Sequence, residues 1–294
     1  MARGFSTTSR IDRRLILGGL ASLAFSGATA APPRTISHQG DGRTPFANRG
    51  RLTMAGSQAF TAETPQGAHN IRIFPSSRGA SPLVRVELRP GERRPGERDV
   101  RERVEFRSAR NNPNGVTRWY AGAFRVDDFV PDAAYNILMQ WHSNAAIQSS
   151  SRRGPWLRFA LPPGEEGRLE IQHRGSDRSG RDSQPIRTVI DLPVGQWHTF
   201  VVEARTSLTD GRLNVWIDGR RVVQWSGGLM GDFHSVGRTR ADMGFMKFGF
   251  YRWGMRPDNR PVQSTAVAWY ANIEEGSDLS ARIHRPLPIP DIPE

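Results

Sequence analysis

Short segments in which apolar and polar residues alternate run through most of this chain, and this period of two constrains its fold more than any other feature. Turn signals separate the segments, and no helical apolar period lasts beyond two turns. Such alternation is typical of β-strands with one buried face. An Asp218-Gly219 pair between two apolar runs also predicts a hairpin. We therefore expect an all-β fold, a single antiparallel β-sandwich, with strands in the segments 69–74, 83–89, 101–107, 118–126, 136–143, 156–161, 168–174, 199–205, 212–225, 246–253 and 265–274.

The first 30 residues have the organisation of an export signal. Arg13 and Arg14 precede an apolar run over 15–25, which ends in the small-residue site 28–30. The run is too short to span a bilayer, and the arginine pair suits twin-arginine export, with an ordinary Sec signal as the alternative. We expect cleavage after Ala30 and a periplasmic or secreted protein.

The rest of the chain divides into three parts. Residues 31–56 are rich in Gly, Pro, Arg and Ser and predict a linker or extended lead-in. Residues 57–284 carry the alternating segments and are expected to form one domain. The proline-rich tail 285–294 is expected to lie along the surface, because proline cannot donate to a β-ladder.

Charge narrows the choice of partner. The formal net charge is +12, which indicates an anionic partner. For an exported protein, an acidic polysaccharide is a better candidate than nucleic acid, and no segment predicts stable membrane insertion.

Cysteine is absent, so a disulfide framework, a thiol nucleophile and a cysteine metal site are excluded. We expect a monomer.

Lys247 is the only lysine among 41 basic residues, and it lies in the segment FMKFGFYRW. A lysine retained in an arginine-biased chain indicates a place that needs a compact ammonium. The even-numbered residues from 246 to 250 are apolar and would face the core. The odd-numbered ones would share the opposite face: Lys247, Gly249 and Tyr251. We interpret the glycine as room for an anionic ligand to approach the sheet.

Two further segments predict polar faces of the same kind. In RERVEFR, the residues opposite the apolar face are Arg103, Glu105 and Arg107. In NILMQWH, Gln140 and His142 share a face, opposite Ile137, Met139 and Trp141. Three such strands in one sandwich predict a polar groove across a concave sheet.

These segments resemble motifs of the jelly-roll polysaccharide lyases. RVEFR, QWH and MKFGFY are similar to the R-x-E-x-R, Q-x-H and Y-x-K-x-G-x-Y segments of the alginate lyase family, with Phe245 in place of the first tyrosine. The whole pattern is closer to the heparin lyase I and glucuronan lyase group, which has strands like LVRVELRPGE and GQWHTF in the same order. The resemblance covers about residues 60–275 and implies a jelly-roll, concanavalin-like sandwich.

The resemblance implies β-elimination from an acidic, uronate-containing polysaccharide, with endolytic action. Arg103 and Gln140 would neutralise the uronate carboxylate. His142 or Tyr251 would remove the proton, and Tyr251 also suits protonation of the leaving oxygen. The polymer stays open among glucuronan, a heparin-like chain and alginate. The further groove residues that we expect to contact substrate are Lys247, Glu105, Arg107, Gln172, Arg174 and Trp253.

Several alternatives stay open. The segment RVELR from Arg85 has the same spacing as RVEFR, and the order of the motifs favours Arg103. Glu97, Asp99 and Glu102 spell E-x-D-x-x-E, the carboxylate pattern of jelly-roll glycoside hydrolases. A non-catalytic module that binds acidic glycans is a third class. We expect no required cofactor and find no metal-ligand cluster; a structural Ca²⁺ on loop oxygens is compatible with the sequence but cannot be located. His173 and His198 are expected to be structural.

Overall fold

The computed structural model describes most of the chain after residue 49. The export signal and nearly all of the lead-in lie outside the described residues, which are 50–54, 59–65, 67–74, 81–93, 95–96, 101–109, 112–113, 115–129, 134–142, 155–175, 185–229, 244–253 and 264–293. In this part of the chain, no helix is long and apolar enough to cross a membrane.

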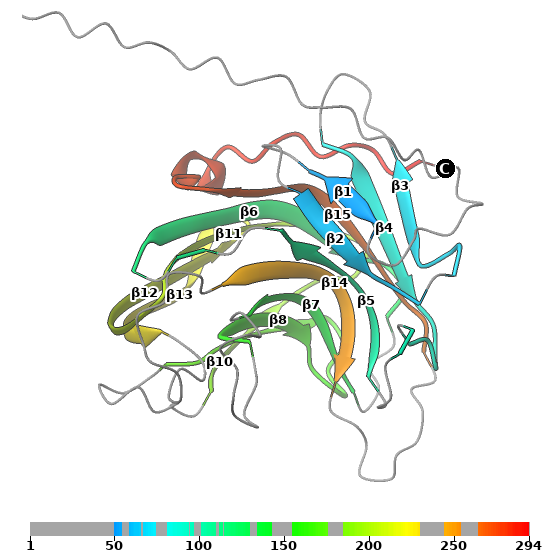
Figure 1. Cartoon of the computed structure of the whole chain (residues 1–294), viewed down its shortest axis with the longest axis horizontal. Coiled ribbons are helices and arrows are strands. Elements are labelled where there is room, and N and C mark those ends of the chain that lie inside the picture. The colour runs from blue at the N-terminus through cyan, green and yellow to red at the C-terminus, as the bar shows by residue number, and fades with distance from the viewer. Residues whose placement is uncertain are drawn as a thin grey trace, which may run out of the picture. The chain divides into compact units, whose positions relative to one another are not determined.

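Two antiparallel sheets make up the fold (Figure 1). The 8-stranded sheet has the order β1-β2-β5-β14-β7-β8-β9-β10. Its strands are β1 (Arg51–Thr53), β2 (Ala59–Glu63), β5 (Glu102–Ser108), β14 (Phe245–Trp253), β7 (Tyr135–His142), β8 (Leu157–Leu161), β9 (Arg168–His173) and β10 (Ile186–Asp191).

The 7-stranded sheet has the order β13-β12-β11-β6-β15-β4-β3. Its strands are β13 (Arg220–Leu229), β12 (Ser207–Ile217), β11 (Trp197–Arg205), β6 (Thr117–Val126), β15 (Ala266–Gly276), β4 (Leu83–Leu88) and β3 (Ile71–Phe74). One short 3-10 helix, Ser280–Ile283, follows β15. The predicted all-β antiparallel sandwich is confirmed, and every segment expected to be a strand contains one. The prediction missed β1, which lies inside the predicted lead-in, and also β2 and β10.

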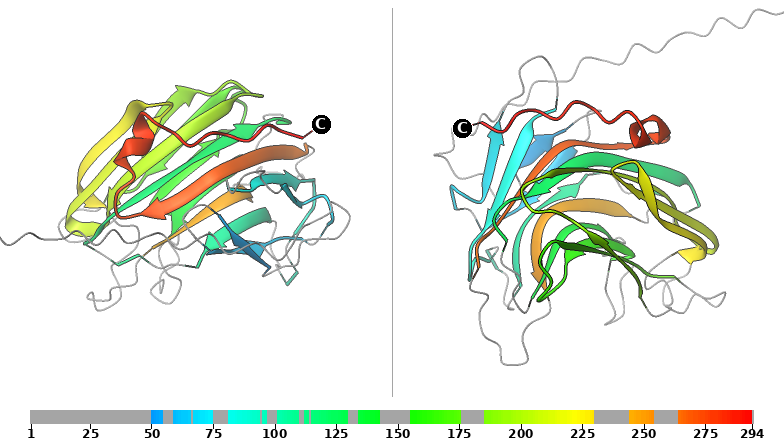
Figure 2. Two further views of the ribbon diagram at one scale, coloured as in Figure 1. Left: turned by 90° about the horizontal axis from the view of Figure 1, so that it is seen from above. Right: turned by 180° about the vertical axis from the view of Figure 1, so that it is seen from behind.

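The views in Figure 2 show the two sheets as layers, and the buried apolar side chains of both sheets form one core cluster. Aromatic rings connect the layers: Trp141 on β7 lies edge-on to Tyr120 on β6, with ring centroids 5.7 Å apart. Phe159 on β8 meets Phe200 on β11 at 6.1 Å in the same geometry. Such edge-to-face pairs add to the free energy gained by burying large apolar surfaces.

The strands β14, β7 and β8 bend strongly, and the face turned away from the core lies on the inside of the bend (Figure 1). We call this the concave face. It carries the polar sides of these strands, because their apolar sides are used in the core.

The predicted hairpin at Asp218-Gly219 joins β12 to β13. Both residues have positive φ, 49° and 75°, as a type I′ turn requires. The Asp218 carboxylate accepts a hydrogen bond from the Thr199 backbone at 2.7 Å and contacts His198 Nδ1 at 2.8 Å. His198 therefore holds the hairpin, a structural role.

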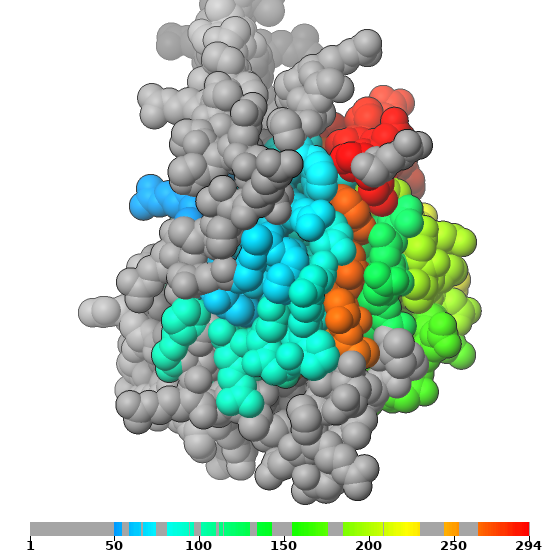
Figure 3. Space-filling view, turned by 90° about the vertical axis from the view of Figure 1, so that its right-hand side faces the viewer, coloured from blue at the N-terminus to red at the C-terminus, as the bar shows by residue number. Residues whose placement is uncertain are grey.

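The C-terminal segment lies against the outer face of the 7-stranded sheet. Figure 3 shows β4, β15 and β6 side by side on this surface, with the C-terminal segment near their upper end. The Asn272 side chain donates to the Pro288 carbonyl at 2.9 Å, and Ile289 and Ile292 pack against a small apolar cluster that contains Trp269. These contacts fix the segment to the sandwich.

Candidate active site

Strands β5, β14 and β7 are neighbours in the 8-stranded sheet, and their register brings the predicted polar faces together. Lys247 on β14 lies opposite Arg107 on one side and Gln140 on the other. Tyr251 lies opposite Arg103, and His142 lies opposite Phe245. The predicted residues of these three strands thus form one patch on the concave face.

Two cations and two carboxylates form a ring in this patch. Lys247 Nζ lies 2.7 Å from Glu63 Oε2 and 3.4 Å from Glu105 Oε2. Arg103 Nη1 contacts the same two oxygens at 3.2 and 3.5 Å. The sequence analysis did not identify Glu63, which is the last residue of β2.

The ring explains how two carboxylates can face each other in the sheet. Glu63 lies directly opposite Glu105 across β2 and β5, an arrangement that repulsion would destabilise. The side chains of Lys247 and Glu105 are only 8% and 2% exposed, so their charges need partners. With Arg103, the four formal charges balance. Lys247 thus forms ion pairs with two carboxylates of the protein itself.

The side chains of Arg107 and Gln140 keep N–H donors that can bind a ligand. The Arg107 guanidinium lies 3.9 Å from the centroid of the Phe245 ring and forms no ion pair with the described residues. Gln140 Nε2 donates to Glu105 Oε1, which leaves one N–H of the amide. Its buried Oε1 has no hydrogen-bond partner among the described residues. The Arg107 guanidinium and the second N–H of Gln140 are donors that can receive an anion, whereas Gln140 Oε1 is an acceptor and needs a donor.

His142 is held in its neutral form. Burial lowers its pKa to about 3, and the positive charges of Lys247, Arg103 and Arg107 act in the same direction, while Glu63 opposes them. At neutral pH the imidazole therefore carries one proton, on one of its two ring nitrogens. A bound carboxylate would raise this pKa and make His142 a stronger base.

Tyr251 is half-buried on the concave face, and the Arg103 guanidinium lies 4.6 Å from its ring centroid. Gly249, two residues earlier, has φ 124°. A Cβ there would lie 2.2 Å from the Val104 carbonyl oxygen, so the backbone of β5 requires the glycine. Our interpretation of Gly249 as space for a ligand is wrong: the space is taken by the neighbouring strand.

Adjacent bulges in β14 and β7 set the direction of the side chains. Along β7, Met139 pairs with Phe248, and Ile137 pairs with Tyr251, so β14 has one extra residue between these pairs. The prediction that Ile137 shares the face of Met139 and Trp141 is therefore wrong, because the irregularity at Leu138 shifts the alternation.

A buried tyrosine of the opposite sheet supports both bulges. Tyr270 Oη on β15 lies 3.1 Å from the Leu138 carbonyl oxygen and 3.2 Å from that of Gly249. Irregular strands leave backbone groups unpaired, and the single O–H of this hydroxyl is shared between the two carbonyl oxygens from the core side. Tyr270 thereby stabilises the backbone that carries Tyr251.

The other predicted contact residues are further from this patch. Gln172 on β9 lies on the concave face two strands from Gln140, with Arg158 on β8 between them. Arg174 follows the end of β9. The side chain of Trp253 lies outside the described part of the structure. Arg158, missed by the sequence analysis, is 7% exposed.

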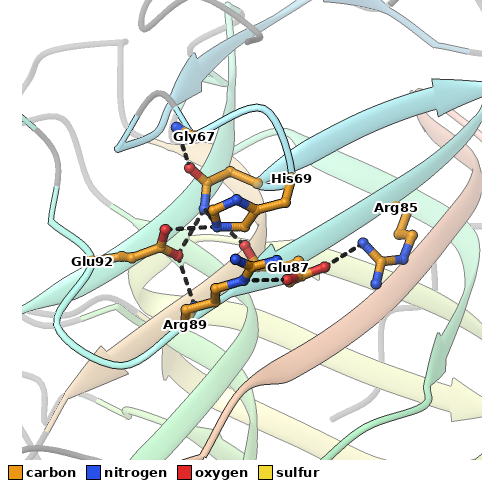
Figure 4. Close-up of polar contacts among 7 residues, drawn as sticks. Gly67, His69, Arg85, Glu87, Arg89 and Glu92 are labelled. Atoms are coloured by element: carbon orange, nitrogen blue, oxygen red, sulfur yellow. Dashed lines mark hydrogen bonds and ion pairs between the residues drawn. The ribbon is translucent and has the colours of Figure 1, made fainter. Parts of the chain in front are cut away.

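The alternative arginine segment belongs to the other sheet. Arg85 lies on β4, where its Nη1 contacts Glu87 Oε2 at 2.7 Å, and Arg89 Nε contacts Glu87 Oε1 at 2.6 Å (Figure 4). Next to this cluster, His69 contacts Glu92 at 2.7 Å. No predicted acid–base residue of the concave face lies on this sheet, so RVELR contributes nothing to the patch.

The carboxylates of the glycoside hydrolase pattern form no described pair. Glu102 is buried and binds Arg252 Nη1 at 2.9 Å and the Gly91 backbone at 2.6 Å, contacts that serve the fold. Glu97 and Asp99 lie outside the described residues. Within the described ranges, no group of three His, Asp or Glu side chains could hold a metal ion.

His173 allows a test of acid stability. It lies on β9 against Trp225, with no hydrogen bond to either ring nitrogen in the described structure, and burial lowers its pKa to about 4. In the unfolded chain the imidazole of His173 takes up a proton near pH 6.5. The free energy of unfolding should therefore fall as the pH drops from 6.5 to 4. Because one pKa unit corresponds to about 1.4 kcal/mol, His173→Leu should reduce this loss by about 2–3 kcal/mol. Thermal melts at pH 7 and pH 4 measure it, with the exposed His284→Gln as control; equal acid losses in wild type and His173→Leu would contradict the assignment.

A jelly-roll sandwich with acid–base groups and cations gathered on its concave face has the architecture of a carbohydrate-active enzyme. The family model described as polysaccharide lyase matches residues 50–274. The chain therefore belongs to the polysaccharide lyase family, and the protein is a polysaccharide lyase.

Solved structures share the fold at low sequence identity. An endo-β-1,4-glucuronan lyase from the fungus Trichoderma reesei is 13% identical, with 81% of this chain and 95% of that chain covered and a TM-score of 0.54. An alginate lyase from Pseudomonas aeruginosa is 16% identical, with 74% and 97% covered and a TM-score of 0.49. No curated protein sequence matches the chain.

Proposed function

We propose that this lyase is exported and cleaves a uronate-containing polysaccharide endolytically by β-elimination. The observation that carries the proposal is the combination, on one face, of Arg107, which forms no ion pair within the described part of the chain, with a neutral His142. β-Elimination requires a cation for the uronate carboxylate and a proton acceptor that is unprotonated at working pH.

The chemistry needs two proton transfers. The carboxylate of the uronate binds Arg107 and the second N–H of Gln140, which stabilise the charge that develops when the proton on C5 leaves. This assigns to Arg107 the pairing first expected of Arg103, because Arg103 is already balanced by Glu63 and Glu105. The electron pair of the C5–H bond forms the C4–C5 double bond, and the C4–O bond breaks.

His142 and Tyr251 divide these transfers. The neutral imidazole accepts the C5 proton, and the Tyr251 hydroxyl protonates the leaving glycosidic oxygen. In a substrate of opposite stereochemistry at C5, the proton would face Tyr251, which would then serve as acceptor and donor in turn. The bulge at Gly249 and the guanidinium of Arg103 hold the Tyr251 ring for either task.

A panel of uronate polymers tests the proposal, with glucuronan first, then a heparin-like chain and alginate. Each elimination creates a conjugated double bond that absorbs in the ultraviolet. We expect this absorbance to rise in step with new reducing ends on at least one polymer, and viscosity to fall early if cleavage is internal. Reducing ends without the absorbance would support hydrolysis, and binding without fragments would support a glycan-binding module.

Ionic strength gives a second prediction. The net charge is +12 for the full chain and +12 − 3 = +9 without the first 30 residues. It should attract a polyanion over distances that salt screens, since the Debye length falls from about 10 Å at 0.1 M to about 3 Å at 1 M. The apparent KM should therefore rise several-fold over this range, while kcat changes much less. Initial rates at a series of salt concentrations measure both, and a KM independent of salt would contradict a polyanionic substrate.

Export and oligomeric state are part of the same proposal. The N-terminal 30 residues would direct the chain to the periplasm or the medium, and the mature domain would act as a monomer. Fractionation of cells that produce the full chain, with N-terminal sequencing of the product, tests cleavage after Ala30.

A further inference from the structure

A single row of side chains crosses the concave face from β5 to β10. Register pairs join each member to the next strand: Arg107, Lys247, Gln140, Arg158, Gln172 and Arg187. The row contains four cations and two amides but no carboxylate. Only its first three members belong to the patch described above.

At the far end of the row, arginines outnumber acids in the described ion pairs. The oxygens of Glu170 lie 3.5 Å from Arg158 and 3.9 Å from Arg187. Two guanidinium groups thus share one carboxylate, and 3.9 Å is too long for a hydrogen bond. The Arg187 side chain is 56% exposed and can reach a ligand. Burial lowers the pKa of Arg158, which Glu170 offsets only in part.

This end shares one feature with the surroundings of Arg107, an arginine held over an aromatic ring. Arg107 lies over Phe245 at 3.9 Å, and Lys247 separates it from the amide of Gln140. Here, Arg158 lies over the Tyr135 ring at 4.8 Å, beside the amide of Gln172. An arginine held on a ring and flanked by an amide presents N–H donors in fixed directions, which suits a carboxylate.

The separation of the two arginines sets the size of the ligand. Arg107 and Arg158 lie on β5 and β8, which are three strand spacings apart, or about 14 Å at about 4.8 Å each. Arg187 lies two strands further. One sugar cannot bridge this distance, whereas a chain of several sugars lying across the strands can.

We propose that Arg158, Gln172 and Arg187 form a second carboxylate-binding site for the same substrate chain, several sugar units from the point of cleavage. This inference rests on the proposed function and extends it: the preferred substrate is a polymer with carboxylates on several units, rather than one with a single uronate among neutral sugars. The site gives long chains an affinity that short oligomers do not gain.

Arg187→Gln tests the site, because this exposed side chain can be replaced without opening the core. The control is Arg72→Gln, which removes the same charge from an exposed position on β3 of the other sheet. The measured quantity is kcat/KM on the long polymer divided by kcat/KM on the shortest oligomer that is cleaved. We expect this ratio to fall roughly threefold to tenfold in Arg187→Gln, as for loss of a partly exposed charge contact, and to stay constant in Arg72→Gln.

The double variant Arg158→Gln/Arg187→Gln should lower the ratio further, provided that its melting temperature shows a folded protein. An unchanged ratio in Arg187→Gln, or an equal fall in Arg72→Gln, would overturn the second site while the lyase activity stands. Failure of the proposed function has a different signature, since no uronate polymer would then give the ultraviolet absorbance at all.

Discussion

Tyr251→Phe is expected to lower kcat by about 10²–10⁴ while KM changes little. The substitution keeps the ring beneath the Arg103 guanidinium, at 4.6 Å, and removes only the hydroxyl to which we assign a proton transfer. Loss of a general acid or base has this magnitude, and loss of an interaction made only in the transition state appears in kcat. Initial rates on the best polymer, followed by ultraviolet absorbance, give both constants.

The matched control is Tyr135→Phe, on β7 and on the same concave face, where the ring under Arg158 is kept and the hydroxyl is lost. Neither proton transfer involves Tyr135, so the fall in kcat should be specific to position 251. Near-full activity of Tyr251→Phe would exclude the assigned proton transfer on this strand.

The alternation of the sequence predicts most of the sandwich because buried and exposed faces differ strongly along the central strands. Val104 and Phe106 are fully buried, and Arg103 and Arg107, which alternate with them, lie on the concave face. The order of the motifs also identified the sheet of the candidate site, since β5, β14 and β7 are adjacent.

Other features depend on contacts between distant strands, which a period of two does not encode. Glu63 ends a strand of five residues with little apolar signal, and its partners are 40 or more positions away. The bulges at Gly249 and Leu138 add residues to one strand relative to its neighbour, and this can be seen only once the register is known.

Lys247 shows both what the sequence could predict and what it could not. Its rarity indicated a constrained position, and Lys247 is indeed buried between two carboxylates. The nature of the constraint could not be predicted, because both carboxylates come from other strands. A lysine ammonium fits between Glu63 and Glu105, where a planar guanidinium would need more room.

Arg103→Ala is expected to lower kcat/KM by more than about 10², because two functions of the guanidinium are lost together. Glu63 and Glu105 would face each other with Lys247 as their only remaining cation in the ring, and Tyr251 would lose the group above its ring. Removing one partner from a buried charge cluster costs about 3–5 kcal/mol, so a shift of the nearby catalytic groups should accompany the loss.

Arg85→Ala is the matched control, because RVELR and RVEFR differ by one residue and lie in different sheets. It breaks the contact with Glu87 at 2.7 Å, but Glu87 keeps Arg89 at 2.6 Å. We expect kcat/KM within about twofold of wild type, as for a partly exposed ion pair.

Arg103→Lys distinguishes a loss of chemistry from a loss of folding. The lysine restores the charge balance with Glu63 and Glu105 but not the forked guanidinium, so the free energy of unfolding should recover more than kcat. If activity in the Arg103 variants followed only the folded fraction seen by circular dichroism, or if Arg85→Ala were the inactive variant, the catalytic patch would have to be sought outside β5.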